Sequence, residues 1–409
     1  RNPQKNHSRR RLRLLLALRS AGTIYMKTIG VFFGSRSPEH DISILTAMRV
    51  MDGFASLSEC NPVPVYISKR GEWFAGEALG SVEFFQNPNY ENNLRRHAIA
   101  SVGFENGKLV LMPRRKNFFT AGKPVILDLA FPCMHGKYGE EGTLQGLFEM
   151  AGIPYVGCGV AASAITMDKI RARRLLGAAG IPGVATSEVS REEFLRDKAR
   201  IGGEVKSSFG YPAFVKPNSL GSSIGVSRVN NEKELEWALN VAFQFDTTVL
   251  VERAVENIKE VNVGVIGHRN LTVSEPEEPR WSGAFQTFDD KYVIKGGTIA
   301  QSEKGKSKSV IPADISPQMR DTLRTAAEKA FRAIGCSGIT RFDFMINTKS
   351  EEWYLTEANP LPGTLQSHVW QACGIALPEL IKKLIGFAEE RHQEEQSLTR
   401  VFASSVLQK

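Results

Sequence analysis

From Met26 onward, short apolar runs alternate with segments whose apolar residues recur at helical spacing. This alternation is typical of an α/β protein. In the first part of the chain it predicts strands over residues 28–33, 62–67 and 125–132 and helices over residues 41–54 and 142–151. These elements predict an open parallel α/β domain over residues 26–157. A polar, glycine-punctuated stretch at about residues 68–123 predicts an insertion of short strands and loops.

The pattern after residue 157 predicts two smaller α+β units. The central unit, residues 158–251, is predicted to have helices over 161–166, 168–179, 190–206 and 231–243 and strands over 213–216 and 249–252. Ser190 and Glu193 have the spacing of a capping box at the start of the third helix. The C-terminal unit, residues 252–409, is predicted to have strands over 259–266, 340–347 and 352–358 and helices over 316–334 and, as a polar fraying end, after about 387.

The overall composition is that of an ordinary globular protein. Hydrophobic residues make up 42% of the 409 residues and charged residues 23%, which excludes disordered and collagen-like classes. No apolar run approaches the ~20 residues that cross a bilayer, so no membrane partner is expected. The five cysteines are widely spaced and form no C-x-x-C pair, which favours a reducing cytoplasm over a disulfide framework or a zinc site.

The net charge of +8 is concentrated at the start of the chain. Residues 1–25 hold seven arginine or lysine residues and no acidic residue, which leaves +1 for the rest. We therefore expect no nucleic acid among the partners. Two interpretations of residues 1–25 remain open. The first is a disordered basic arm, which could act as an amphipathic helix or a targeting segment, and the second is an extension foreign to the native protein. The position of Met26 directly before the first strand favours the second interpretation.

A Gly/Ser-rich loop after a predicted strand is a candidate phosphate-binding element. Lys216 ends the strand, and Gly221, Ser222, Ser223 and Gly225 follow it. Glycines let the backbone approach a polyanion, while N–H groups, hydroxyls and a lysine can all meet phosphate oxygens. The spacing is not that of a P-loop. A flexible hairpin without a ligand is the alternative.

Two later strands carry a candidate metal site. Arg341 and Asp343 share one strand face by period 2, and Glu357 and Asn359 share one face of the next strand. If these strands pair, three oxygen ligands and an arginine converge, which suits Mg²⁺ bound together with a nucleotide. The alternative is a solvated sheet face with an ordinary ion pair.

Two polar loops follow strands of the first domain. One contains Glu39, His40 and Ser43, and the other runs from His135 to Gly142. Open α/β sheets bind ligands at the carboxyl ends of their strands. We therefore expect both loops to line one crevice.

Together these motifs resemble the ATP-grasp fold and, more narrowly, the D-alanine–D-alanine ligase family. The resemblance extends from about Met26 to Phe387, and its specificity comes from the order and spacing of nine motifs. These are E-H-D-I-S (39–43), H-G-K-Y-G-E-E-G-T-L-Q-G (135–146), G-I-P-Y-V-G (152–157), A-S-A-x-x-M-D-K (162–169), A-G-I-P (179–182), V-K-P-N-S-L-G-S-S-I-G-V (215–226), D-K-Y (290–292), R-F-D (341–343) and E-A-N-P-L-P-G (357–363).

The resemblance implies a three-domain α/β ligase in which two α+β subdomains sandwich ATP. It implies that the nucleotide contacts Lys169, Lys216, Ser222, Ser223, Glu252, Arg253, Val255 and Glu260. It further implies two Mg²⁺ ions, with Mn²⁺ as a possible substitute, held by Asp343, Glu357 and Asn359.

The resemblance also implies how substrates are held. Glu39 would bind the ammonium of the first D-alanine in a network with Ser222 and Tyr292, and His135 would lie near its carboxylate. Arg341 and the Gly363 N–H would stabilise the tetrahedral oxyanion, and Lys291 would face the second carboxylate. The chain departs from the family at the serine that holds this second carboxylate, where counting places His368 with Ser367 beside it. Residues 295–309 are predicted to form a mobile lid.

The activity implied by the resemblance is ATP-dependent formation of D-alanyl-D-alanine for peptidoglycan synthesis. ATP would convert one D-alanine to an acyl phosphate, which a second D-alanine attacks, releasing ADP and phosphate. D-lactate or D-serine as the acceptor is the alternative within this class, and a non-catalytic nucleotide-binding module is the alternative outside it. A homodimer in the cytoplasm is expected by the same resemblance.

Overall fold

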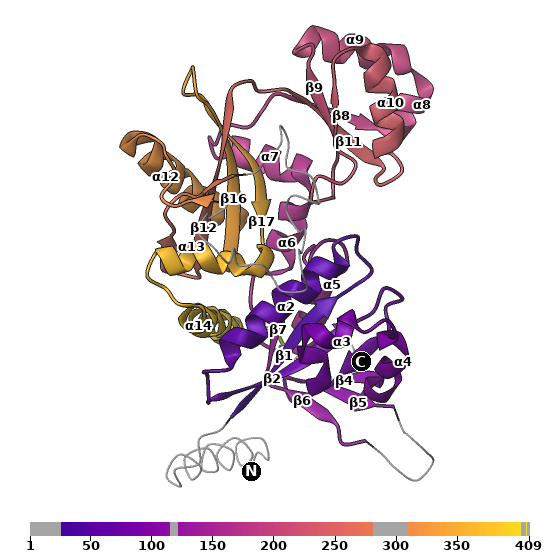
Figure 1. Ribbon diagram of the computed structural model, residues 1–409, viewed down its shortest axis with the longest axis vertical. Helices are drawn as coiled ribbons and strands as arrows, with labels where there is room; N and C mark the ends of the chain where they lie inside the picture. Colours follow the sequence, from indigo (N-terminus) through magenta and orange to yellow (C-terminus); the bar gives the residue numbers. More distant parts are fainter. Residues whose placement is uncertain (1–25, 115–121, 281–308, 402–405, 407–409) are drawn as a thin grey trace.

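The chain folds into three parts arranged along the long axis of the molecule, with the C-terminal sheet between the N-terminal part and the central part (Figure 1). The structure is a computed structural model that describes residues 26–114, 122–280, 309–401 and 406. The N-terminal arm, Lys291, Tyr292 and all of the predicted lid except Ser309 lie outside the described residues.

A four-stranded sheet, ordered β3-β2-β1-β7, forms the centre of the N-terminal part. β1 (Lys27–Gly34) lies parallel to β2 (Cys60–Ile67) and β7 (Leu129–Pro132), and β3 (Trp73–Ala75) pairs antiparallel with β2. Six consecutive residues of β1 are buried, as its continuous apolar run predicts for a strand covered on both faces. The helices of this part are α2 (His40–Phe54), η1 (Glu77–Gly80), α3 (Val82–Gln86), α4 (Tyr90–Leu94), η2 (Arg95–His97) and α5 (Thr143–Ala151).

The insertion contains more helix than the sequence predicts. Four of the short helices, η1 to η2, lie within it, and the Ser81 hydroxyl caps α3 by accepting a hydrogen bond from the Phe84 N–H. A second sheet, ordered β4-β5-β6, follows them. Its strands are β4 (Ile99–Glu105), β5 (Lys108–Pro113) and β6 (Val125–Leu127).

The prediction of one strand over residues 125–132 is wrong. The stretch divides at Asp128 into β6, which belongs to the second sheet, and β7, which belongs to the parallel sheet. The Asp128 carboxylate accepts a hydrogen bond from the Thr28 N–H at 2.9 Å and pairs with Lys108. These polar partners hold the chain where it passes from one sheet to the other.

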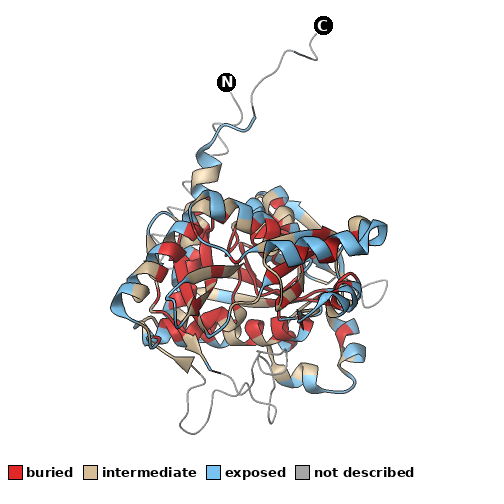
Figure 2. Cartoon of the chain, turned by 90° about the horizontal axis from the view of Figure 1, so that it is seen from above, coloured by how far each residue is buried: buried red, intermediate tan, exposed pale blue. Residues whose placement is uncertain are grey.

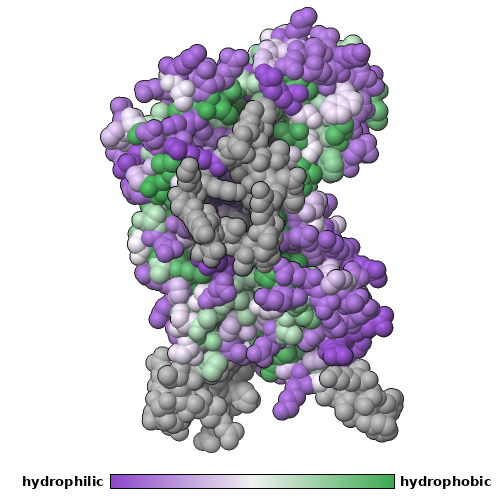
Figure 3. Space-filling view, viewed as in Figure 1, coloured by the Kyte–Doolittle hydropathy of each residue, from purple (hydrophilic) through white to green (hydrophobic). Residues whose placement is uncertain are grey.

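The central part contains an antiparallel sheet ordered β10-β9-β11-β8 and packed against helices. Its strands are β8 (Thr186–Ser190), β9 (Ala213–Pro217), β10 (Ser227–Val229) and β11 (Thr248–Arg253), and its helices are α8 (Arg191–Arg196), α9 (Lys198–Ser208) and α10 (Glu232–Ala242). Hydrophilic residues predominate on the visible surface around these helices (Figure 3).

The capping box at the start of α8 is confirmed, with Ser190 and Glu193 bonding reciprocally. The prediction of one continuous helix over 190–206 is wrong, because Asp197 leaves the helical conformation with φ −154°. Its side chain accepts from the Arg200 N–H and so starts α9 as a new helix.

The C-terminal part has an antiparallel sheet ordered β13-β12-β16-β17. Its strands are β12 (Ile258–Gly267), β13 (Leu271–Val273), β16 (Gly338–Asn347) and β17 (Trp353–Asn359), beside a small pair of β14 (Glu278–Pro279) and β15 (Ser309–Val310). The helices are α6 (Val160–Met167), α7 (Lys169–Ala178), α12 (Pro317–Ile334), η3 (Gly363–Gln366), α13 (Ser367–Ala372) and α14 (Leu377–Ser397). Residues of α6, α7 and α12 share one apolar core with β12, β16 and β17. The domain boundaries at residues 158 and 252 stay predictions.

The expectation of a fraying end after about residue 387 is wrong. α14 continues to Ser397, and Arg391 in its final third is buried. The Arg391 guanidinium donates to the carbonyls of Gly157 at 2.5 Å and Tyr155 at 3.1 Å and lies 4.1 Å from the Tyr155 ring centre. These bonds anchor the polar end of the helix on the segment that leaves the N-terminal part.

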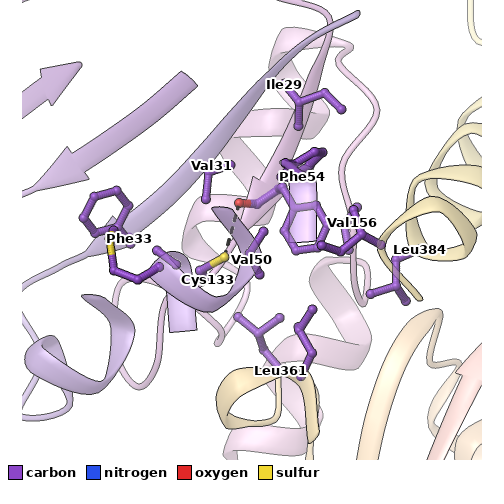
Figure 4. Packing of buried hydrophobic residues seen from close by; sticks show 14 of the residues in the cluster. Ile29, Val31, Phe33, Val50, Phe54, Cys133, Val156, Leu361 and Leu384 are labelled. Atoms are coloured by element: carbon purple, nitrogen blue, oxygen red, sulfur yellow. Dashed lines mark hydrogen bonds between the residues drawn. The ribbon is translucent and has the colours of Figure 1, made fainter. Parts of the chain in front are cut away.

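One apolar core connects the N-terminal sheet to the C-terminal helices. Ile29 and Phe54 of the N-terminal part pack in the same cluster as Leu361 and Leu384 of the C-terminal part (Figure 4). Seen from above, buried residues concentrate in the interior and exposed residues on the outer helices (Figure 2). Within the described ranges, no helix combines the length and apolar character that crossing a membrane requires.

Candidate active site

All three parts of the molecule contribute to a cavity of about 1080 Å³. The predicted site residues that line it are Glu39, His135, Lys169, Lys216, Ser222, Ser223, Glu252, Arg253, Val255, Glu260, Arg341, Asp343, Glu357, Asn359, Gly363 and His368. Ser367 is buried outside the lining, and its hydroxyl accepts from Arg49 Nε at 3.2 Å. Lys291 and Tyr292 lie outside the described residues.

Strand pairing brings the predicted oxygen ligands together, as the period-2 argument requires. β16 and β17 pair antiparallel, with Asp343 opposite Glu357 and Arg341 opposite Asn359. The register shifts just after Asp343. Phe342 and Phe344 are buried on the other face, so the charged face and the apolar face of β16 are both as predicted.

The charges on this face neutralise one another. Arg341 donates to both oxygens of Asp343, at 2.6 and 2.7 Å, and Asn359 Nδ2 donates to the same carboxylate at 3.0 Å. Lys169 lies 3.0 Å from Glu357. Two carboxylates and an amide oxygen are hard ligands of the kind Mg²⁺ prefers, and three protein ligands leave room for phosphate and water. The donor set therefore fits the implied metal ions, although the described residues contain no group of three or more His, Cys, Asp and Glu side chains able to hold one.

A buried carboxylate marks the part of the cavity next to the central sheet. Glu252 is 3% exposed and accepts hydrogen bonds from Lys216 at 2.7 Å and Arg173 at 2.6 Å. Burial alone raises its pKa, but the charges of Lys216 and Arg173 outweigh burial and hold the pKa of Glu252 below its ordinary value. Arg173 was missed by the sequence reasoning. Its spacing of four residues from Lys169 on α7, which places both cations on one helix face, was the available signal.

The Gly/Ser loop joins the central part to the N-terminal part. The Ser222 hydroxyl donates to the Glu39 carboxylate, and Lys169 Nζ donates to the Leu220 carbonyl at 2.6 Å. Ser222 and Ser223 have φ values of 54° and 58°, a left-handed conformation that is uncommon for residues other than glycine. Local strain of this kind clusters at ligand-binding sites, and Ser222 and Ser223 both line the cavity.

The loop after β7 supplies two further ionisable groups. His135 Nε2 lies 2.8 Å from Thr46 Oγ1, and its Nδ1 lies 4.0 Å from Glu140. Burial and the charge of Arg341 lower the pKa of His135 to about 4, so the imidazole is neutral at pH 7. Burial and the charge of Glu39 raise the pKa of Glu140 well above its ordinary value, even though its carboxyl accepts from the Gly136 N–H at 2.8 Å. Glu140 belongs to the His135–Gly142 motif but had not been singled out.

The expectation that His40 and Ser43 line the crevice is wrong. Both are buried, and neither belongs to the cavity lining. His40 Nδ1 contacts the Ser35 carbonyl at 2.6 Å and Nε2 contacts Tyr66 Oη at 3.1 Å. The Ser43 hydroxyl joins the ends of two strands by accepting from the Gly34 N–H and donating to the Cys133 carbonyl, both at 2.8 Å. These two residues shape the loop that presents Glu39.

His368 lines the cavity and contacts a residue that the sequence did not indicate. Its Nε2 lies 2.6 Å from Glu277 Oε1, and Gln366 Nε2 donates to Glu277 Oε2 at 3.2 Å. Burial alone raises the pKa of Glu277, but the hydrogen bond and charge of His368, together with the charge of Arg341, outweigh burial and lower it. The atypical sequence around residues 273–281 gave no chemical reason to select Glu277.

A cavity enclosed by two antiparallel α+β units beside an open parallel sheet is the arrangement of ATP-grasp ligases. Solved structures with this arrangement confirm the predicted fold. A D-alanine–D-alanine ligase from Coxiella burnetii is 26% identical with a TM-score of 0.75, covering 91% of this chain and 96% of that one. The VanG D-Ala:D-Ser ligase from Enterococcus faecalis is 31% identical with a TM-score of 0.71, covering 89% and 99%.

Sequence comparisons narrow the class to one family. The family models described as D-ala D-ala ligase N-terminus and C-terminus match residues 28–158 and 175–386. A D-alanine–D-alanine ligase of Thermosipho melanesiensis is 37% identical over 374 residues, which are 90% of this chain and 96% of the relative. The corresponding protein of Geobacillus kaustophilus is 34% identical over 389 residues, 92% and 99% of the two chains. The chain belongs to the D-alanine–D-alanine ligase family.

Proposed function

We propose that this protein joins two D-alanine molecules at the expense of ATP, through a D-alanyl phosphate, and so supplies D-alanyl-D-alanine for peptidoglycan. The observation that carries the proposal is that Lys169, Lys216 and the oxygen ligands of β16 and β17 line one cavity with Glu39. Family membership favours catalysis over a non-catalytic nucleotide-binding module.

The nucleotide end of the cavity is proposed to lie between the central and C-terminal sheets. Lys169 and Lys216 would turn from their carboxylate partners toward the phosphates, and Ser222 and Ser223 would donate from the strained loop. Glu252 would accept a hydrogen bond from the adenine amino group while it retains the hydrogen bond from Arg173, since a carboxylate has about four acceptor positions. Arg253, Val255 and Glu260 line the adjoining wall and would contact adenine and ribose.

Asp343, Glu357 and Asn359 are proposed to hold two Mg²⁺ ions, with Mn²⁺ as a substitute. Bound there, the ions would supply positive charge against the phosphate oxygens. Arg341 forms an ion pair with Asp343, which supports a position of its guanidinium beside the proposed reacting centre. Together with the Gly363 N–H it would stabilise the oxyanion of the tetrahedral intermediate.

Glu39 is proposed to bind the ammonium of the donor amino acid. Ser222 already donates to this carboxylate, and Tyr292 would join the network. The raised pKa of Glu140 favours its neutral form, which would reduce the negative charge that a substrate carboxylate meets. At ~4 Å and an effective dielectric constant near 20, one removed repulsion between like charges is worth about 4 kcal/mol. The neutral His135 brings no positive charge to this place but can still form a hydrogen bond.

The acceptor is proposed to be a second D-alanine, with Lys291 and His368 near its carboxylate. Ser367, which is buried and already bonded to Arg49, fits this contact less well than His368. The likeness to a solved D-Ala:D-Ser ligase supports D-serine as the second candidate acceptor, with D-lactate a further alternative. A cytoplasmic homodimer is also proposed, and the five free cysteines agree with a reducing compartment.

The proposal is tested by measuring ADP release with ATP, MgCl₂ and D-alanine, together with chromatography of the products. We expect ADP and D-alanyl-D-alanine in equal amounts, and activity to be lost without a divalent cation. Glu357→Gln should reduce turnover at least about a hundredfold, because one charged ligand is lost, while circular dichroism remains unchanged. Competition among D-alanine, D-serine and D-lactate identifies the acceptor. A wild-type protein that releases no ADP with any of these acceptors refutes the proposal.

A further inference from the structure

The turn η3, which follows β17, has an unusual backbone conformation. Its residues Thr364, Leu365 and Gln366 have φ values of 50°, 56° and 45°. A left-handed conformation is uncommon for residues that carry a side chain, and each such residue costs about 1–3 kcal/mol unless the surrounding structure holds it. Gly363, which opens the turn, and Thr364 both line the cavity. Three strained residues in succession at the cavity wall therefore need support from the rest of the fold.

This support comes from α2 of the N-terminal part. The Thr46 hydroxyl accepts a hydrogen bond from the Thr364 N–H at 3.1 Å. Three residues later on α2, Arg49 Nε donates to Ser367 Oγ at 3.2 Å. The side chain of Leu365 is buried in the apolar core that α2 shares with the C-terminal part. A helix of one part of the molecule therefore holds the strained turn of another.

The Thr46 hydroxyl is fixed between two partners. Thr46 is 0% exposed, and its Oγ1 also lies 2.8 Å from His135 Nε2. A hydroxyl has one proton to donate and two lone pairs that accept. Because Oγ1 accepts from the Thr364 N–H, its proton is available for Nε2, and a neutral imidazole can accept it. The hydroxyl is therefore oriented with a lone pair directed at the turn.

The bond to Thr46 fixes a peptide plane next to the proposed oxyanion donor. Glycine has the largest backbone freedom of all residues, so the Gly363 N–H has to be oriented by its neighbours. On one side, the ring of Pro362 restricts its φ, which is −66°. On the other side, the planar peptide between Gly363 and Thr364 contains the N–H that bonds to Thr46. A methyl group on Gly363 would meet no atom of the described residues within 4 Å, so packing does not supply this restraint.

The same helix presents the proposed donor-binding carboxylate. Glu39 is the N-cap residue of α2, and Thr46 lies seven residues further along. Seven residues are about two helical turns, so the two side chains share a helix face and lie about 10 Å apart along its axis. In the donor amino acid, the ammonium and the reacting carbonyl are attached to the same carbon. One rigid helix therefore keeps the contact for the ammonium in register with the contact for the carbonyl oxygen.

We propose that Thr46 positions the Gly363 N–H for the tetrahedral intermediate, so that α2 aligns the oxyanion contact with the bound donor. The inference rests on the proposed ligase function and adds a positioning residue that touches no substrate. In the step concerned, the acceptor nitrogen attacks the carbonyl carbon of D-alanyl phosphate, and the carbonyl oxygen takes up the electron pair. When the carbonyl forms again, phosphate leaves with the electrons of its bond to carbon, and the nitrogen gives up a proton to solvent. Phosphoryl transfer from ATP to the donor passes through no such oxyanion and does not depend on Thr46.

The test compares Thr46→Val, which keeps the shape of threonine without the hydroxyl, with wild type in two measurements. Dipeptide formation from ATP and D-alanine reports the whole reaction. Movement of a heavy oxygen isotope from the bridge between the β- and γ-phosphates of ATP to a non-bridging β position reports reversible formation of D-alanyl phosphate. We expect dipeptide formation to fall about tenfold, as for a lost hydrogen bond. Isotope movement per dipeptide formed should rise about tenfold, and the KM for ATP should remain within about twofold of wild type.

Three further variants separate positioning from structure. Thr46→Ser retains the hydroxyl and should return both measurements to within about twofold of wild type. Thr340→Val is the matched control, because Thr340 is also 0% exposed but its hydroxyl lies 3.6 Å from Cys158 Sγ instead of contacting the turn. Its isotope movement per dipeptide should equal that of wild type. Thr46→Ala repeats the test without the second methyl group of valine beside the turn.

Each outcome decides the inference. A selective fall in dipeptide formation in folded Thr46→Val, absent in Thr46→Ser and Thr340→Val, supports it. Unchanged isotope movement per dipeptide overturns it, whether the activity of the variant is full or is lost equally in both measurements. Failure of both Thr46→Val and Thr46→Ala to fold also overturns it, because Thr46 would then serve stability alone. A wild-type protein that forms no dipeptide and moves no isotope refutes the ligase function itself.

Discussion

Two buried glutamates on the cavity wall have opposite electrostatic environments. Glu252, 3% exposed, lies between Lys216 and Arg173, and its pKa is lowered. Glu140, 9% exposed, lies near Glu39, and its pKa is raised. Burial disfavours the charged form of both carboxyls, so the neighbouring charges decide which one ionises.

The difference agrees with what each end of the cavity is proposed to bind. At the proposed nucleotide end, Glu252 accepts hydrogen bonds from Lys216 and Arg173, two cations suited to phosphate. At the proposed donor end, the raised pKa of Glu140 favours its neutral form, which would limit the negative charge around a substrate carboxylate. The fold thus shifts the pKa of two glutamates in opposite directions by placing cations beside one and a carboxylate beside the other.

The largest effect on stability is expected from Glu252→Gln. Removing the charge leaves Lys216 and Arg173 without their counter-ion in a buried setting, which should lower the free energy of unfolding by about 3 kcal/mol. Urea unfolding at pH 7 measures it. Glu236→Gln is the control, because Glu236 pairs with Lys198 on the surface and should change stability very little. Equal stability of the two variants would show that the cations do not depend on Glu252.

A smaller effect is expected from the neutral His135 at the donor end. Its pKa is about 4 in the folded protein against 6.5 ordinarily, so only the unfolded chain gains this proton as pH falls. The stabilising contribution is complete above pH 6.5 and is lost as pH falls toward 4. As pH falls from 7 to 4, the free energy of unfolding of His135→Gln should therefore decrease by about 2 kcal/mol less than that of wild type. Parallel stability curves from urea unfolding across this range would contradict a neutral, buried imidazole.

The smallest effect is expected from Glu140→Gln, and its sign is opposite to that of Glu252→Gln. Because the pKa of Glu140 is raised in the folded state, its contribution to the free energy of unfolding is fully present below about pH 4.5. This contribution is lost as pH rises through the folded pKa. Glutamine cannot ionise, and its oxygen can still accept from the Gly136 N–H. The variant should therefore be more stable than wild type at pH 8 by about 1 kcal/mol, with no difference near pH 4. A variant that is less stable at pH 8 would show that Glu140 is ionised in the native protein.

Much of the site was predictable where the chemistry follows from local periodicity. Arg341, Asp343, Glu357 and Asn359 alternate with apolar residues, so their shared face could be predicted before their pairing was known. The Gly/Ser loop was predictable from its composition. Breaks within elements were not, as Asp128 and Asp197 show. Each of these aspartates interrupts an element by accepting a hydrogen bond from one particular N–H group, that of Thr28 for Asp128 and that of Arg200 for Asp197. The sequence alone does not show which N–H group will be in reach.

The sequence by itself determined most of the longer strands and helices, which face of β16 carries charge, and the family to which the chain belongs. These follow from the order of residues along the chain. The tertiary structure decided that Arg173 reaches Glu252, that His40 turns into the core and that Glu277 holds His368, 91 residues away. Such tertiary contacts join side chains of different strands and helices, and local spacing along the chain does not specify them. The ionisation of each buried carboxyl depends on the same contacts, since it is set by the charges that the fold brings within a few ångströms.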